Sequence, residues 1–342
     1  MEQGLYHPQH GYYSSDRATI GRRGDYFTSV NVGPLFGQLL AVQFAEIWER
    51  LGKIDNFTIV EQGAHHGEFA RDVLALAQKS RSEFFEALHY RIVEPFPNLQ
   101  DRQSQTLSEF CAKVDWSNSL EPFIGVHFSN ELLDAMPVHL LVSTGDGWRE
   151  RFVALEGDKF VFVEQPLVDR SLPRLPERPV GYETEINLAA LDWLDDLAAK
   201  LTCGYVVVID YGLSRDDFYA PHRTGGTLQV RAQHRPLPSP LDEIGLADIT
   251  AHVNWTSLAA RAETRGLRGL GFTDQHHFVT GIISELPALP EDSKTKRALQ
   301  TLLHPEMLGR AFQVLGLAKG VDFGAPLAGF KFARDARGAL GI

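Results

Sequence analysis

Apolar residues near the start of the chain follow a helical period and then change to short continuous runs. Between Val32 and Leu51 they recur at helical spacing, which predicts a helix, and Gly52 is a suitable residue to end it. The next run, Phe57 to Gly63, is short and apolar and predicts a buried strand. The segment EFARDVLALAQ follows directly, and its spacing predicts a second helix.

Strand and helix patterns continue to alternate along the chain. Further apolar runs predict strands at HYRIVEP (His89 to Pro95), VDW (Val114 to Trp116), IGVHFSNELLDAMP (Ile124 to Pro137, a strand and its turn), CGYVVVIDYG (Cys203 to Gly212) and FQVLGLAKG (Phe312 to Gly320). Continuous apolar strands are typical of a parallel sheet that helices cover on both faces. The sequence therefore predicts an α/β, doubly wound fold.

Two segments interrupt this alternation. The β-rich sequence from Val138 to Leu167 contains Gly145-Asp146-Gly147, a turn sequence that predicts an antiparallel insertion between the fourth and fifth strands. A second insertion extends from about Leu213 to Thr264. The segment before Ser29 is rich in Gly, Tyr and His and predicts loops with short helices.

The chain is acidic, and its charge limits the partners that we expect. Its 342 residues carry a formal net charge of −11 at pH 7. Nucleic acids and other polyphosphates require a basic face, so this balance argues against such partners. It is compatible with a small cationic ligand or a basic protein segment.

Cysteine content and the N-terminal sequence indicate a reducing, cytoplasmic location. The only cysteines are Cys111 and Cys203, and neither lies in a metal-like CxxC pair. The opening residues, MEQGLYHPQHGYY, contain no basic and apolar leader, so we expect no secretion signal. No apolar run approaches the ~20 residues that span a bilayer, so we expect no membrane segment.

Glu61, Gly63 and Gly67 form a candidate ligand-binding turn between the first buried strand and its helix. Ligands of such sheets bind at the carboxyl ends of the strands, and glycines allow a close approach to the backbone. Glu61 would repel a pyrophosphate, whereas it suits the cationic amino acid moiety of S-adenosylmethionine. The alternative is that the two glycines only end a strand and begin a helix.

Acidic residues at the next two strand ends extend this candidate site. Glu94 ends the second strand, where its carboxylate could accept hydrogen bonds from ribose hydroxyls; alternatively it is a solvated loop acid before Pro95. Asp115 ends the third strand, where an adenine amine could find an acceptor. We include the neighbouring residues Ala64 and Trp116 in the predicted cofactor site.

His65 and His66 raise the possibility of a metal site. Adjacent residues on a helix point in different directions, and no His or Cys follows at the positions that would share a face with them. We therefore predict no bound metal.

Motifs along most of the chain resemble the MidA-like family of S-adenosylmethionine-dependent methyltransferases, which includes the mitochondrial complex I assembly factor that methylates a protein arginine. They are LYHPQHGYYSS, GDYFTSVNVGPLFGQLLA, EQGAHHG, IVEP, SNELLDAMPVH, WRER, VIDYG, TLQVRAQH, ADITAHVNW and TDQHHFV, in family order from residue 5 to about 320. His65 stands where the family usually has the middle glycine of its turn. We expect a side chain to be acceptable there if φ is negative and the side chain points away from the ligand.

The resemblance implies an enzyme that methylates a protein, with arginine as the acceptor. It implies a Rossmann-like class I methyltransferase sheet with helices on both faces, an N-terminal helical segment and a β-rich insertion. We predict a cofactor-covering segment over 1–55, a methyltransferase domain over 56–137 and 200–342, and insertions over 138–199 and 213–264. Thr28, in the N-terminal segment, is expected to lie at the methionine end of S-adenosylmethionine.

Asn130, Glu131 and Asp134 are the predicted catalytic residues because they follow the fourth strand, at the rim of the cofactor crevice. Glu131 and Asp134 share a face if the segment is helical, and two carboxylates could grip a guanidinium. Alternatively, Asn130 caps a helix and the two acids favour its first turn.

Three histidines within the family motifs are predicted to line the substrate site: His234, His252 and His276. Each could instead be a packed or solvated residue. Asp210 and Tyr211 end the central strand beside them, where buried structural support and substrate contact are both possible.

Two other functions remain open from the sequence. A binding or assembly protein that keeps the fold without the cofactor would explain His65. A nicotinamide or flavin oxidoreductase could use a similar sheet, although Glu61 and the missing G-x-G-x-x-G argue against it. A homodimer is compatible with the β-rich insertion.

Overall fold

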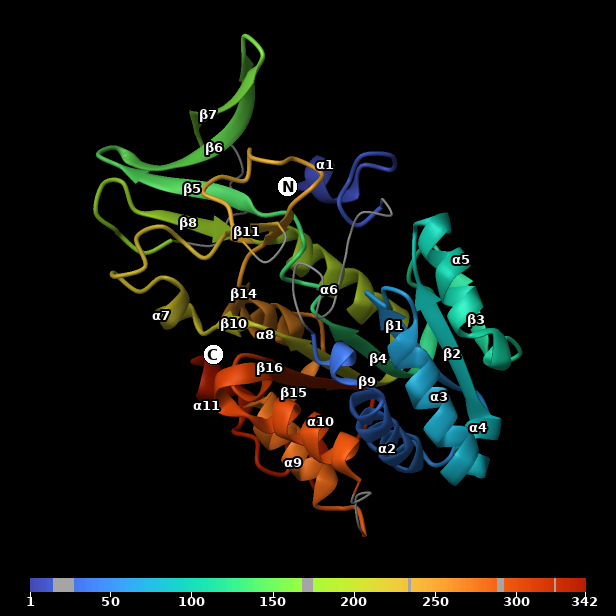
Figure 1. The fold of residues 1–342 in the computed structure, drawn as a ribbon. Helices are drawn as coiled ribbons and strands as arrows, with labels where there is room; N and C mark the ends of the chain where they lie inside the picture. The colour runs from blue at the N-terminus through green and yellow to red at the C-terminus, as the bar shows by residue number, and fades with distance from the viewer. Residues whose placement is uncertain (15–27, 168–174, 233–234, 288–291, 323) are drawn as a thin grey trace. The chain divides into compact units, whose positions relative to one another are not determined.

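The computed structural model describes residues 1–14, 28–167, 175–232, 235–287, 292–322 and 324–342 (Figure 1). The chain divides into two compact units. One comprises Met1–Tyr26, Leu133–Trp193 and Gly212–Leu258, and we call it the insertion unit. The other comprises Phe27–Leu132, Leu194–Tyr211 and Ala259–Ile342, and we call it the sheet unit. The predicted domain boundaries stay predictions.

The sheet unit is built on a seven-stranded sheet in the order β15-β16-β9-β4-β1-β2-β3. Its strands are β1 (Phe57–Gln62), β2 (Leu88–Val93), β3 (Val114–Ser117), β4 (Phe123–Asn130), β9 (Leu201–Asp210), β15 (Arg268–Asp274) and β16 (Gln313–Lys319). The strands from β9 to β3 run parallel, whereas β16 is antiparallel to both of its neighbours. The predicted α/β fold and each of the predicted sheet strands are confirmed.

One strand of this sheet was not predicted. β15 lies at the edge and contains a register shift between Gly269 and Gly271. Gly271 and its strand partner Gly316 leave room for the ring of Phe330, because a Cβ at Gly316 would lie 2.4 Å from that ring. Glycines that admit a neighbouring aromatic ring remove the apolar alternation by which a strand is predicted.

Helices surround this sheet and complete its core. They are η1 (Val30–Val32), α2 (Leu35–Arg50), α3 (Glu68–Ser80), α4 (Ser82–Ala87), α5 (Pro97–Thr106), η2 (Ser108–Phe110), α9 (Gln275–Ile283), α10 (Ser293–Leu303), η3 (Pro305–Gly309), η4 (Ala328–Phe330) and α11 (Ala336–Leu340). The predicted helices after Val32 and Glu68 correspond to α2 and α3, which pack against each other. Buried apolar side chains of both helices join those of β1 and β4 in one core cluster.

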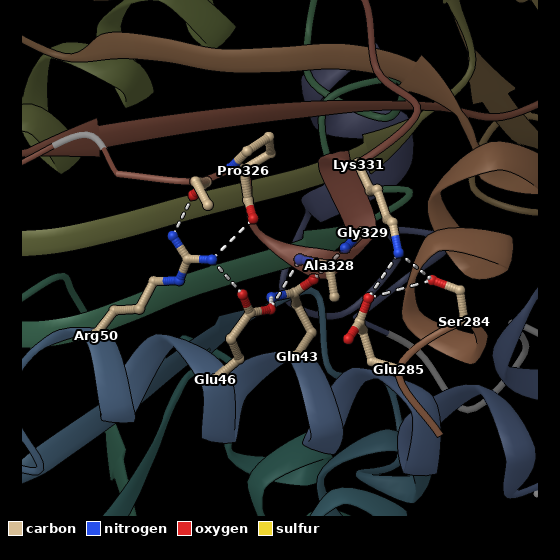
Figure 2. Close-up of polar contacts among 10 residues, drawn as sticks. Gln43, Glu46, Arg50, Ser284, Glu285, Pro326, Ala328, Gly329 and Lys331 are labelled. Carbon is tan, nitrogen blue, oxygen red and sulfur yellow. Dashed lines mark hydrogen bonds and ion pairs between the residues drawn. The ribbon is translucent and has the colours of Figure 1, made fainter. Parts of the chain in front are cut away.

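Hydrogen bonds tie the C-terminal segment to α2 (Figure 2). The Gln43 side chain accepts from the backbone N–H of Gly329 at 2.6 Å, and Glu46 accepts from that of Ala328 at 2.8 Å. Arg50 pairs with Glu46 at 2.7 Å on the next turn of the helix. These bonds satisfy buried and half-buried backbone donors and fix the position of α2 within the sheet unit.

The insertion unit contains smaller sheets. The first has the order β7-β6-β5-β8, from β5 (His139–Thr144), β6 (Gly147–Glu156), β7 (Lys159–Pro166) and β8 (Glu183–Ile186). The others are formed by β11 (Gln229–Ala232), β12 (Arg235–Pro236) and β13 (Asp248–Thr250), and by β10 (Gly212–Leu213) with β14 (Val253–Asn254). The short helices α1 (Glu2–Tyr6) and α7 (Arg215–Phe218) belong to the same unit, and the division between units falls within α6 (Leu188–Lys200) and α8 (Trp255–Thr264).

The antiparallel insertion predicted from the sequence is present as the sheet of β5 to β8. Gly145 and Asp146 form the turn between β5 and β6, where Thr144 pairs with Gly147. None of the described helices is both long enough and apolar enough to cross a membrane.

Candidate functional site

The turn after β1 is held in a conformation that favours glycine. Gly63 has φ +79° and Gly67 has φ +83°, and the backbone N–H of Gly67 donates to the carbonyl of Ala64 at 2.8 Å. His65 has φ +47°, so the condition of a negative φ at this position is not met. Histidine adopts a positive φ more often than most residues do. The conformation is nevertheless costly for any residue other than glycine, so the turn carries local strain.

Glu61 lies beneath this turn, in the core of the sheet unit. Its carboxylate accepts a hydrogen bond from the Tyr90 hydroxyl at 2.6 Å, and the side chain is almost fully buried. Burial raises the pKa of Glu61 to about 8, an effect that the Tyr90 hydrogen bond partly offsets and the nearby Glu68 reinforces. A cation close to this carboxyl would favour its ionised form.

Glu94 follows β2 directly and is also buried. Its carboxylate accepts from the backbone N–H of Phe96 at 3.1 Å and from the side-chain amide of Gln103 at 3.1 Å. Burial raises the pKa of Glu94 to about 7, although both hydrogen bonds act in the opposite direction. The alternative of a solvated loop acid is wrong for this residue.

Gln103 of α5 joins the turn, Glu94 and the third strand, and sequence reasoning missed it. Its side-chain nitrogen donates to the carbonyl of His65 at 2.9 Å as well as to Glu94, and its oxygen accepts from the Trp116 indole at 2.9 Å. The side chain is fully buried. Its segment, PNLQDRQSQT, is polar apart from Pro97 and Leu99, so only the neighbouring strand ends could have indicated a role.

Asp115 is engaged in an ion pair on the sheet. Its carboxylate lies 2.9 Å from the Arg91 guanidinium and 2.5 Å from the His89 ring, both on the adjacent strand β2. Trp116 is the next residue and packs against the core cluster. The ion pair gives Asp115 a structural role, while its predicted role with an adenine amine stays a prediction.

The residues after β4 form no helix. The condition under which Glu131 and Asp134 would share a face is therefore not met, and the alternative that Asn130 is a helix N-cap is wrong. Glu131 instead has φ +54°, and its backbone N–H donates to the carbonyl of Ile209 at 2.9 Å. Its carboxylate accepts from the Asn130 amide at 2.9 Å, so the two predicted catalytic residues of the sheet unit are in contact.

Asp210 supports the backbone of the same region. It is fully buried at the end of β9, and its carboxylate accepts from the backbone N–H of Tyr211 at 2.8 Å and of Leu132 at 3.2 Å. The sequence left both structural support and substrate contact possible for Asp210, and these bonds favour structural support.

Asp134 and His252 belong to the insertion unit, where their backbones are neighbours. The carbonyl of Asp134 accepts from the N–H of Ala251, the residue before His252, at 2.9 Å. The N–H of His252 donates to the Thr227 hydroxyl at 3.1 Å. Burial lowers the pKa of His252, and Arg223 lowers it further. The His252 side chain lines a small cavity with others that include Asn187, Tyr219 and Asn254.

The remaining predicted residues lie in varied surroundings. The His276 ring contacts the carbonyl of Leu303 at 2.8 Å, and the Thr28 hydroxyl donates to Asn31 at 3.0 Å. These contacts give both side chains local structural partners within the sheet unit. His234 lies outside the described residues.

The chemistry of these residues suits a ligand that carries hydroxyls and a positive charge. Gly63 and Gly67 present no side chain in a turn whose backbone conformation disfavours any. Glu61 and Glu94 are buried carboxyls close to that turn, and both become stronger acceptors when ionised. A parallel sheet with a glycine turn after its first strand and an acid after its second is typical of Rossmann-like nucleotide-binding enzymes.

Comparison with known proteins identifies the family to which the chain belongs. Residues 39–273 match the sequence model of the family described as "Putative S-adenosyl-L-methionine-dependent methyltransferase". This match covers more than half of the chain, and the chain therefore belongs to that family. The resemblance inferred from the sequence motifs is confirmed.

Relatives of known sequence and structure agree with this assignment. The chain is 28% identical to the mitochondrial protein arginine methyltransferase NDUFAF7 homolog of Drosophila melanogaster, over 94% of this chain and 80% of the relative. It is 26% identical to protein arginine methyltransferase NDUFAF7 of Homo sapiens, over 98% of this chain and 82% of the relative. A crystal structure from Burkholderia thailandensis with bound S-adenosyl-homocysteine is 31% identical, has a TM-score of 0.86, and the match covers 97% of this chain and 89% of that one.

The protein is an S-adenosylmethionine-dependent methyltransferase, and S-adenosylmethionine is its cofactor. A second crystal structure is that of a Burkholderia thailandensis protein described as uncharacterized. It is 30% identical to this chain and has a TM-score of 0.83, and the match covers 97% of this chain and 88% of that one. Both similarities extend over the insertion unit as well as the sheet unit, so the Rossmann-like fold with its β-rich insertion is shared.

Proposed function

We propose that this methyltransferase transfers a methyl group to an arginine side chain of a protein. The relatives from Drosophila melanogaster and Homo sapiens are named protein arginine methyltransferases, which supports the same acceptor here. The net charge of −11 also suits a cationic side chain or a basic segment.

Methylation of arginine makes a demand that carboxylates can meet. A guanidinium has a pKa above 12, and its delocalised positive charge makes each nitrogen a weak nucleophile. A carboxylate that accepts from two N–H groups orients the third nitrogen and draws positive charge away from it. S-adenosylmethionine supplies an activated methyl group, so the protein's residues mainly position the two partners.

The conformation of Glu131 is the observation that carries this proposal. A left-handed φ costs a side chain other than glycine about 1–2 kcal/mol, and such strain concentrates at functional sites. Glu131 adopts it at the end of β4, with its backbone bonded to Ile209 and its carboxylate to the Asn130 amide. We assign Glu131 as a carboxylate that binds the guanidinium and Asn130 as its positioning residue. The catalytic role predicted for Asp134, which belongs to the insertion unit, stays a prediction.

The cofactor roles are proposals of the same kind. We assign Glu94 to the ribose hydroxyls, and Gly63, Ala64 and Gly67 to the backbone turn that S-adenosylmethionine approaches. Glu61 supplies negative charge for the cationic end. Trp116, Asp115 and Thr28 are proposed to complete the site. The substrate contacts predicted for His234, His252 and His276 stay predictions.

The names of the relatives also bear on the partner and the cellular location of the protein. A protein substrate is the partner that the names of the relatives support, and a homodimer through the β-rich insertion is a further proposal. The cytoplasmic location predicted from the sequence stays a prediction, because the curated relatives are named mitochondrial proteins whereas the two similar crystal structures are bacterial.

Transfer of a labelled methyl group tests the proposed acceptor. The purified protein is incubated with lysate proteins and methyl-labelled S-adenosylmethionine, and the labelled proteins are then hydrolysed to amino acids. We expect the label in methylarginine. Recovery of the label only in other amino acids or in small molecules would contradict arginine as the acceptor while leaving the methyltransferase activity intact.

A further inference from the structure

Three side chains at the turn after β1 point their possible ligand atoms at one another. His65, His66 and Glu68 each offer a nitrogen or oxygen that lies within 4.8 Å of the others. The two imidazole rings stack with centroids 3.6 Å apart, and the Nδ1 atom of His66 lies 3.9 Å from the Glu68 carboxylate. The turn therefore gathers a set of donors that is typical of a transition-metal site.

Backbone conformation explains why adjacent histidines can act together here. The two residues lie before α3 and not on it, and the left-handed φ of His65 turns its side chain toward that of His66. The sequence argument against a metal site assumed that both histidines lie on a helix. They do not, so that argument is wrong. Glu68, the first residue of α3, adds a carboxylate from the adjoining helical turn.

An ion in solution can reach this cluster, because the side chains of His66 and Glu68 are 28% and 40% exposed. An imidazole that is not protonated on the nitrogen facing the ion has a lone pair for it.

Arg102 is the natural competitor of a metal at this site. Its guanidinium lies 3.0 Å from Nε2 of His66, and because arginine only donates, that nitrogen accepts. The proton of the neutral His66 ring is then on Nδ1, which faces Glu68. A metal must either displace Arg102 from Nε2 or replace the proton on Nδ1, and in the second case one proton is released to solvent.

We propose that His65, His66 and Glu68 form a binding site for a zinc ion and that Arg102 opposes its binding. The ion would occupy the turn to which the proposed function assigns S-adenosylmethionine, so zinc and cofactor exclude each other. Both are cations, which adds repulsion to any overlap. The site is thus inhibitory, and zinc plays no part in methyl transfer.

Calorimetric titration of the tag-free full chain with zinc chloride, in a buffer without chelator, tests the site. We expect one zinc per chain. Glu68→Gln and His65→Gly should each weaken zinc binding by about tenfold or more, because even residues that only support metal ligands are worth about 10–100-fold. Arg102→Ala should strengthen it. His222→Ala, which changes an exposed histidine elsewhere, should leave it unchanged.

Several outcomes would overturn the proposal. The first is the absence of saturable zinc binding. The second is wild-type zinc affinity in folded Glu68→Gln and His65→Gly variants. The third is weaker zinc binding in Arg102→Ala. A titration with zinc at saturating S-adenosyl-homocysteine tests exclusion separately. Equal zinc affinity with S-adenosyl-homocysteine bound would disprove exclusion, whereas failure of S-adenosyl-homocysteine itself to bind would count against the cofactor site and not against the zinc site.

Discussion

Gln103 lies fully buried against Glu94, and its side-chain nitrogen donates to the Glu94 carboxylate at 3.1 Å. The same amide also bonds to the His65 carbonyl and to the Trp116 indole. One side chain thus fixes the turn after β1, the acid after β2 and the aromatic residue of β3 with respect to one another. This relationship makes Gln103 a positioning residue for the proposed cofactor site.

Substitution of Gln103→Ala is expected to weaken cofactor binding and to destabilise the fold. Loss of the amide leaves a buried carboxyl, carbonyl and indole with fewer partners, which should lower the free energy of unfolding by about 1–3 kcal/mol. Calorimetry with S-adenosyl-homocysteine and denaturant unfolding measure the two effects. Gln105→Ala, at an exposed position on the same helix, is the matched control and should change neither.

Affinity for S-adenosyl-homocysteine should rise with pH through about 7. Burial raises the pKa of Glu94 to about 7, and its ionised form is the stronger acceptor for hydroxyl groups. Glu94→Gln should remove the part of the pH dependence that is centred near 7, and Glu94→Ala should weaken binding by about 1.5–3 kcal/mol for each hydrogen bond lost. Unchanged affinity in a folded Glu94→Ala protein would exclude Glu94 from the site.

The stability of the cofactor-free protein should fall as pH rises from about 4.5 to about 8 through the contribution of Glu61. Its carboxyl ionises near 4.5 in the unfolded chain and only near 8 in the folded protein, so the folded state holds one more proton across this interval. One proton corresponds to a slope of about 1.4 kcal/mol per pH unit. Unfolding measured across this range should show a shallower decrease in Glu61→Gln, and an identical slope would contradict the assignment.

His65→Gly is expected to stabilise the fold by up to about 1 kcal/mol and to preserve cofactor binding. Glycine removes the cost of a left-handed φ at this position, although its greater freedom in the unfolded chain offsets part of the gain. His66→Gly is the contrasting variant, because His66 has no positive φ, and it should destabilise the protein. Thermal unfolding distinguishes the two, and a large loss of cofactor affinity in His65→Gly would show that the imidazole contacts the ligand.

Much of the sheet could be predicted from the sequence because its strands are buried on both faces. In β9, for example, the residues from Tyr205 to Ile209 are all apolar and buried. β15 could not be predicted in this way, since Gly269 and Gly271 replace side chains where neighbouring residues approach closely. Its strand pairing depends on contacts with β16 that no local pattern encodes.

The candidate site could be predicted in part. Gly63, Gly67 and Glu94 were predicted because strand ends and glycines mark ligand sites in parallel sheets. Gln103 was missed because a buried amide in a polar helix leaves no periodic signal. The turn after β4 was predicted, but the possible helix that would have put Glu131 and Asp134 on one face is absent, because the left-handed Glu131 prevents a helix from starting there. Such a conformation depends on hydrogen bonds to distant residues and not on the local sequence.

Glu131→Gln tests the central claim, that the carboxylate of Glu131, whose backbone is strained, binds the arginine that accepts the methyl group. The substitution keeps the shape of the side chain and removes its charge, so S-adenosyl-homocysteine affinity and melting temperature should stay nearly unchanged. Methyl transfer to protein arginine should fall by about 10²-fold or more, as for other positioned electrostatic groups. Full activity of the folded variant in the labelled-methyl assay would contradict the claim.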